Sequence, residues 1–167
     1  MLDRIISFVY RNDYQALKKL IESGTAINAT VDRYGRTALM HAVLETNVDT
    51  DMVKFLIELG ADVNVCEKQE KWTALHFAAR DLKLERVKVL LTHGALIDPE
   101  DIFGNTPLWR CITSAFPGNK MEVINVLLEN GANPNKKNKS GNSAKDIAIL
   151  AAKTELVKLF DEKANEK

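Results

Sequence analysis

Residues 73–94 read TALHFAARDLKLERVKVLLTHG, and this stretch contains the signals for two short helices joined by a turn. Thr73 suits the position before a helix, because its hydroxyl can accept a hydrogen bond from a free backbone N–H of the first turn. The apolar residues between Val87 and Leu91 cover a broad helical stripe. Gly94 can adopt the left-handed conformation that ends a helix. The stretch therefore predicts a cap, a short helix, a turn, a second helix and a closing glycine.

The closing glycine and the starting hydroxyl both recur along the chain. The glycines are Gly24, Gly60, Gly94 and Gly131, at separations of 36, 34 and 37 residues. The hydroxyl residues are Thr37, Thr73, Thr106 and Ser143, at separations of 36, 33 and 37 residues. A nearly constant period of this length is typical of a stack of helix pairs.

These units resemble ankyrin repeats, whose hallmark is a TPLHxA-type helix start within a period of 33 residues. The third unit begins TALHFAA at residue 73, the second reads GRTALMHA from residue 35 and GADVN at 60–64, and the fourth reads GNTPL from residue 104 and GANPN at 131–135. The resemblance covers nearly the whole chain. It implies an all-α ankyrin-repeat solenoid of about five helix–turn–helix repeats with β-turn or hairpin loops. The expected units are an N-terminal capping repeat at 1–31, repeats at 32–66, 67–99 and 100–136, and a C-terminal capping repeat at 137–167.

The chain departs from the family pattern at several positions. Met40 and Trp109 stand where the family has the histidine represented here by His76, which implies that some hydrogen bonds to the loops are lost. Lys71 and Leu82 occupy positions where the family has glycine. Two inter-helix turns carry insertions, near residues 45–51 and 113–120. Drift in a surface turn is the favoured interpretation of these insertions, with a functional role as the alternative.

Composition argues against several classes of protein. Twenty-three basic and twenty-three acidic residues give a net charge of zero, which removes the overall attraction expected of a nucleic-acid binder. Cys66 and Cys111 stand apart, with no CxxC or Cys/His cluster, so neither a disulfide framework nor a metal site is expected. No long apolar run predicts a membrane span. We therefore expect a cytoplasmic protein without a cofactor.

Residue patterns for catalysis are missing. His41, His76 and His93 are candidate general bases, but each has a structural explanation within the repeat. Cys111 lacks a neighbouring base that would activate it as a nucleophile. The sequence also contains no glycine-rich phosphate loop, HExxH or GxSxG motif. The sequence therefore predicts that the chain is not an enzyme.

The resemblance implies a concave binding surface formed by the turns between repeats and by the first helix of each pair. The residues expected to line it are Arg33, Tyr34 and Arg36; Gln69, Glu70 and Trp72; Ile102, Phe103 and Asn105; and, on the helices, His41, Phe77, Arg80 and Arg110. Tyr34, Trp72, Phe103 and Arg110 are the favoured anchors, because such residues dominate interface hot spots. The alternative is that Trp72 or Phe103 packs against a neighbouring turn. Glu67, Glu70, Glu100 and Asp101 are expected as acidic tip residues, and Lys136, Lys137 and Lys139 as a solvated basic cluster.

The predicted function is an adaptor or inhibitor that binds another protein and is monomeric on its own. One specific form is an immunity or antitoxin-like inhibitor of a toxic enzyme, which only fold analogy supports. An alternative from another class is a structural or self-assembly protein whose end repeats stack on other copies. For the leading hypothesis we expect that replacing Trp72 and Tyr34 together by alanine leaves the fold intact and abolishes partner binding.

Overall fold

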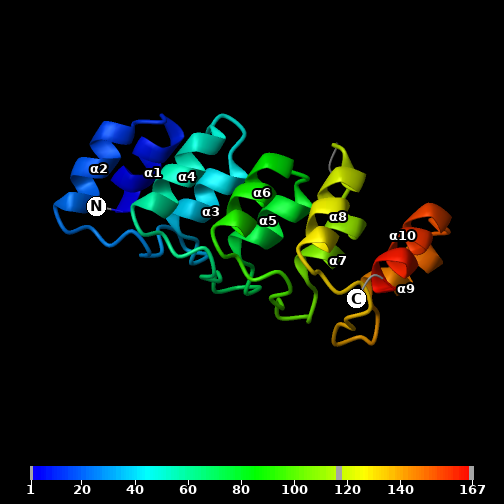
Figure 1. Ribbon diagram of the computed structural model, residues 1–167. Helices are drawn as coiled ribbons and strands as arrows, with labels where there is room; N and C mark the ends of the chain where they lie inside the picture. The colour runs from blue at the N-terminus through cyan, green and yellow to red at the C-terminus, as the bar shows by residue number, and fades with distance from the viewer. Residues whose placement is uncertain (1, 116–117, 166–167) are drawn as a thin grey trace.

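The computed structural model describes residues 2–115 and 118–165, and this part of the chain forms ten helices in five antiparallel pairs. The first helices of the pairs are α1 (Leu2–Tyr10), α3 (Ala38–Leu44), α5 (Ala74–Arg80), α7 (Pro107–Thr113) and α9 (Ala144–Leu150). The second helices are α2 (Tyr14–Glu22), α4 (Thr50–Glu58), α6 (Leu84–Thr92), α8 (Lys120–Glu129) and α10 (Thr154–Asn165). Figure 1 shows the pairs stacked side by side, with the long loops projecting to one side and the termini at opposite ends. The all-α solenoid of five helix–turn–helix repeats predicted from the sequence is confirmed.

The helix starts follow the predicted hydroxyl caps. The side chains of Thr37, Thr106 and Ser143 each accept a hydrogen bond from the backbone N–H three residues later. Thr73 and His76 form a capping box, and Ser143 and Asp146 form another. Each cap satisfies donors that the first turn of a helix leaves without a partner.

Four of the five second helices, α2, α4, α6 and α8, end at the predicted glycines. Gly24, Gly60, Gly94 and Gly131 all have positive φ angles, between 84° and 96°. The residue after each glycine donates its N–H to a carbonyl five residues earlier, as Ala61 does to Leu56 at 2.9 Å. These bonds satisfy carbonyls at the end of the helix and turn the chain into the next loop.

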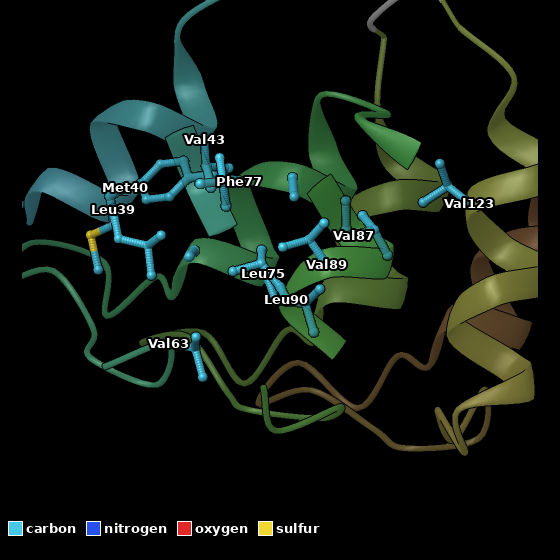
Figure 2. Close-up of a cluster of buried hydrophobic side chains, with 14 of the residues drawn as sticks. Leu39, Met40, Val43, Val63, Leu75, Phe77, Val87, Val89, Leu90 and Val123 are labelled. Carbon is cyan, nitrogen blue, oxygen red and sulfur yellow. The ribbon is translucent and has the colours of Figure 1, made fainter. Parts of the chain in front are cut away.

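The buried core is continuous through the stack. Helix α5 packs against α3 and α7 within its row and against α6 within its pair. Small residues such as Ala74, Ala78 and Ala79 are buried in α5, which lets the neighbouring first helices approach closely. Figure 2 shows larger side chains of this core, among them Leu75 of α5 and Leu90 of α6. Because each repeat buries its faces against the next, the array is stabilised by neighbour contacts.

The two longer turns are held by cationic side chains of the helices α6 and α8. Arg86 of α6 is buried and donates to the carbonyls of Val43 and Val48, both at 2.5 Å, where the first longer turn leaves α3. Lys120 of α8 donates to the carbonyls of Ile112 at 3.2 Å and Ser114 at 2.7 Å in the second longer turn. Residues 116–117 of that turn lie outside the described residues. Both cations occupy backbone acceptors that the lengthened turns would otherwise leave without a partner.

Candidate binding surface

Four hairpin tips project between the repeats, at residues 32–36, 67–72, 101–105 and 138–142. Each begins with an acidic or amide side chain that accepts backbone N–H groups of its own turn. Asp32 binds the N–H groups of Tyr34 and Arg36, and Glu67 binds three such groups at 2.6 to 3.1 Å. Asp101 and Asn138 do the same in the last two tips. The tips are therefore shaped by their own first residue.

Two of these residues correct a prediction from the sequence. Glu67 and Asp101 were expected as acidic tip residues, yet only 4% and 3% of their surfaces are exposed. Their carboxylates point into the turn because the backbone N–H groups there need acceptors. A signal was present in the sequence, since Asp32, Glu67, Asp101 and Asn138 recur at nearly the repeat period.

Successive tips are joined by backbone hydrogen bonds. The N–H of Lys68 donates to the carbonyl of Tyr34 at 3.0 Å, and that of Ile102 donates to Glu70 at 2.9 Å. Lys139 donates in the same way to Phe103 at 2.9 Å. The tips thus form one continuous edge on which side chains are held at fixed spacing.

The histidines brace this edge from below. In His76, Nδ1 accepts the N–H of Thr73 at 3.1 Å, so Nε2 carries the proton and donates to the carbonyl of Asn105 at 3.1 Å. Burial lowers the pKa of His76 to about 4. His41 lies at a neighbouring position of its repeat and contacts Asp32 at 3.1 Å and the Tyr10 hydroxyl at 2.8 Å. His41 thereby restores a tip contact that Met40 cannot make.

Arginine and aromatic side chains alternate along the surface. This arginine–aromatic row consists of Tyr34, Arg36, Phe77, Arg80, Trp72, Arg110 and Phe103. The guanidinium carbon of Arg36 lies 4.7 Å from the ring centre of Tyr34 and 5.4 Å from that of Phe77. The guanidinium carbon of Arg80 lies 5.5 Å from the ring centre of Phe77 and 5.0 Å from that of Trp72. Such stacking contributes about 0.5 to 2 kcal/mol per contact, depending on burial, and fixes long side chains in place.

The far end of the row is anchored by Arg110. Its guanidinium lies 4.5 Å from the ring centre of Trp72 and 6.0 Å from that of Phe103. It also pairs with the buried carboxylate of Asp101, to which Nε donates at 2.9 Å, and lies 3.7 Å from Glu70. Arg110 is thus held by the tip and by the rings at once.

A hollow of about 120 Å³ opens between the second and third repeats of the array. Trp72 and Phe77 are the buried aromatic residues of its lining, and Arg36 and Arg80 stack on their rings. Its remaining lining residues are Glu67, Gln69 and Glu70. This hollow lies on the arginine–aromatic row.

The predicted surface residues fall into three groups. Four are exposed, namely Arg33, Gln69, Glu70 and Phe103. Six are half-buried, namely Tyr34, Arg36, His41, Ile102, Arg80 and Arg110. Three are buried, namely Trp72, Phe77 and Asn105. The structure brings most of them together along one edge, with the exposed members around the buried ones.

Trp72 differs from the expectation for a removable surface anchor. Only 5% of its surface is exposed. The centre of its ring lies 5.0 Å from that of Phe77 and 5.9 Å from that of His76. Trp72→Ala is therefore expected to open a cavity in the core and to lower the stability, so the double variant with Tyr34→Ala does not isolate partner binding. Phe103 is 51% exposed and is the large aromatic side chain that the surface presents to solvent.

The groups considered for catalysis have structural surroundings. Cys111 is fully buried, and burial raises the pKa of its thiol to about 12, so the thiolate is scarce at neutral pH. Within residues 2–115 and 118–165, no three His, Cys, Asp or Glu side chains gather as a metal ion would require. In the same part of the chain, none of the helices has the length and apolar character needed to cross a membrane.

Comparison with known proteins identifies the repeat. A model for ankyrin repeats in three copies matches residues 5–66 and 45–138. A putative ankyrin repeat protein of Rickettsia bellii is 33% identical over 129 residues, which cover 77% of this chain and 67% of that protein. Inversin of Mus musculus is 40% identical over 96 residues, covering 58% of this chain and 9% of inversin. SH3 and multiple ankyrin repeat domains protein 2 of Homo sapiens is 30% identical over 141 residues, which cover 84% of this chain and 7% of that protein.

The chain thus spans two thirds of the rickettsial protein and less than a tenth of the other two relatives.

Proposed function

The chain belongs to the ankyrin repeat family, and from this premise we propose that it acts as an adaptor or inhibitor that binds another protein through its tips and first helices. Ankyrin repeats generally mediate protein–protein interactions and are generally not enzymes. We also propose that the protein is cytoplasmic and has neither a catalytic role nor a cofactor. It also keeps the division into units at 1–31, 32–66, 67–99, 100–136 and 137–167.

The arginine–aromatic row is the observation that carries this proposal. Arginine, tyrosine and tryptophan are enriched at interface hot spots, because they combine a large contact area with hydrogen bonding. Here they lie on a rigid edge, with exposed Phe103 at one end and half-buried Tyr34 at the other. Pre-ordered side chains lose little entropy when a partner binds. The other residues of the row lie between these two aromatic side chains.

Affinity capture with purified variants tests this surface. The test variant replaces Tyr34 and Phe103 by alanine, because both rings reach the surface and neither is part of the buried core. The matched control replaces Lys54 and Lys88 by alanine. Both are exposed residues of the second helices α4 and α6. We expect a protein to be retained by the wild type and the control and lost from the Tyr34/Phe103 variant. Equal retention by all three proteins would show that another surface binds.

Self-assembly is a second candidate, supported by the last helix pair. Ile149 and Leu150 of α9 are 54% and 77% exposed, whereas Val43, Ala79 and Ile112 at the position of Ile149 in earlier repeats are buried. An exposed apolar face of this kind suits the stacking of another repeat. If the capture experiment retains only copies of this chain, and Ile149→Asp abolishes that retention, the self-assembly function replaces the adaptor function.

A further inference from the structure

The hollow between Arg36 and Arg80 has unsatisfied hydrogen-bond donors. The Nε atom of Arg36 and the Nε1 atom of Trp72 are buried, and neither has an acceptor among the described residues. A buried donor without an acceptor costs about 1 to 3 kcal/mol, and folded proteins rarely leave one without a reason. Both side chains line the same hollow. Two residues in the lining of the hollow therefore each hold a donor without an acceptor.

The hollow is lined by two arginines, Arg36 and Arg80, and by two carboxylates, Glu67 and Glu70. Glu67 lines it, but its oxygens are bound to three backbone N–H groups of the tip. Asp32 also binds backbone N–H groups and His41, and it approaches the Arg36 guanidinium only to 4.0 Å. The nearby carboxylates are thus engaged in shaping the tips. The ion pair between Arg36 and Asp32 is long, at 4.0 Å, and the same carboxylate also serves these other partners.

The geometry of Arg36 suits a carboxylate in particular. Its guanidinium is stacked on the rings of Tyr34 and Phe77, which leaves the N–H groups at the edge of the plane for hydrogen bonds. A carboxylate matches two such N–H groups at once. A cationic ligand is disfavoured, because arginines already occupy the faces of the aromatic rings. A hollow of about 120 Å³ has the volume of about four water molecules, which suits a small polar group.

We propose that the hollow binds the carboxylate of an aspartate or glutamate side chain from an acidic segment of the partner, with Arg36 and the Trp72 indole N–H as its donors. This inference rests on the proposed function and names the chemistry that the surface recognises. Gln69 stands at the rim and can donate from its amide. Glu70 also stands at the rim, with its side chain 48% exposed, and its charge opposes the ligand.

The two tryptophans allow a direct test by nuclear magnetic resonance. The indole N–H signals of Trp72 and Trp109 are followed in the full chain during titration with the peptide acetyl-Gly-Glu-Gly-amide, and Trp109→Phe assigns them. We expect a saturable shift of the Trp72 signal, with a dissociation constant on the order of millimolar for so small a contact. The neutral peptide acetyl-Gly-Gln-Gly-amide serves as the matched probe and should give no saturable shift.

Variants of the chain separate charge from shape. Arg36→Gln should weaken binding of the acidic peptide about tenfold, and Arg36→Lys should weaken it less, because the charge remains without the planar fork. Glu70→Gln should strengthen binding a few-fold, because it removes an opposing charge. The unliganded spectrum of each variant shows whether Trp72 keeps its surroundings. Equal shifts with both peptides, or no shift with either, would overturn the proposal.

The result of the peptide titration can be distinguished from that of the capture experiment. If a partner is lost from the Tyr34/Phe103 variant but the acidic peptide produces no shift, the binding surface stands and the carboxylate site is refuted. If the acidic peptide binds but the captured protein is unaffected by the Tyr34/Phe103 substitutions, the hollow is an anion site and the proposed protein-binding surface is refuted.

Discussion

Individual histidines in this chain carry structure through hydrogen bonds that need a neutral ring. His76 accepts from Thr73 with one nitrogen and donates to Asn105 with the other, and it is fully buried. A second proton on the ring would remove the acceptor and place a charge in the core. His76 therefore links the stability of the array to pH.

The free energy of unfolding should fall as the pH decreases from about 6.5 to about 4. The pKa of His76 is about 4 in the folded chain and 6.5 in its ordinary state, so the unfolded chain binds more protons in this window. The maximum slope from this residue is about 1.4 kcal/mol per pH unit. Urea unfolding at a series of pH values measures it. Burial also lowers the pKa of His41, which adds to the slope in the same direction.

The variant His76→Asn isolates the contribution of this residue. It should be less stable than the wild type at neutral pH and should show a shallower dependence between pH 6.5 and 4. Carboxylates with ordinary pKa values protonate mainly at the acidic end of this window, so they do not produce the same profile. A slope that is unchanged in His76→Asn would assign the pH dependence to other groups.

At the scale of the helix and the turn, local chemistry could be read from the sequence and contacts between repeats could not. Thr37 and Gly60 act on backbone groups within a few residues, so their roles followed from residue type and spacing. The backbone at Lys71 is likewise set by its place in the tip. It adopts a φ of 58°, where the other tips have glycine. The burial of Trp72 and Glu67 was missed, because it depends on what the neighbouring repeat and tip place against them.

The first longer turn, for which drift is the favoured interpretation, is held in the structure by Arg86 of the next repeat. Replacing Arg86 by methionine should lower the free energy of unfolding by about 3 kcal/mol, because the carbonyls of Val43 and Val48 lose their donors in a buried place. Chemical denaturation measures the loss. Lys88→Met on the same helix is the control, since Lys88 is exposed and pairs with the exposed carboxylate of Glu85. Equal stabilities of the two variants would show that Arg86 does not support the turn.

At the scale of the whole molecule, one core runs through all the described repeats. Leu90 is fully buried in the middle of the array. Leu90→Ala should lower the free energy of unfolding by about 2 to 5 kcal/mol through a cavity. Because the repeats stabilise one another, we expect a single transition at a lower urea concentration when unfolding is followed by circular dichroism. Two separate transitions in the variant would show that the halves of the array fold independently.

The brace formed by Arg86 also bears on how such an array can be rearranged during evolution. The long turn belongs to the second repeat and the arginine to the third, so the two parts are inherited together only if both repeats move as a block. A recombination event between them would leave either a turn with bare carbonyls or a buried cation without acceptors. The smallest unit of this chain that can be exchanged intact is therefore a neighbouring pair of repeats, and the boundary between them is a poor point for crossing over.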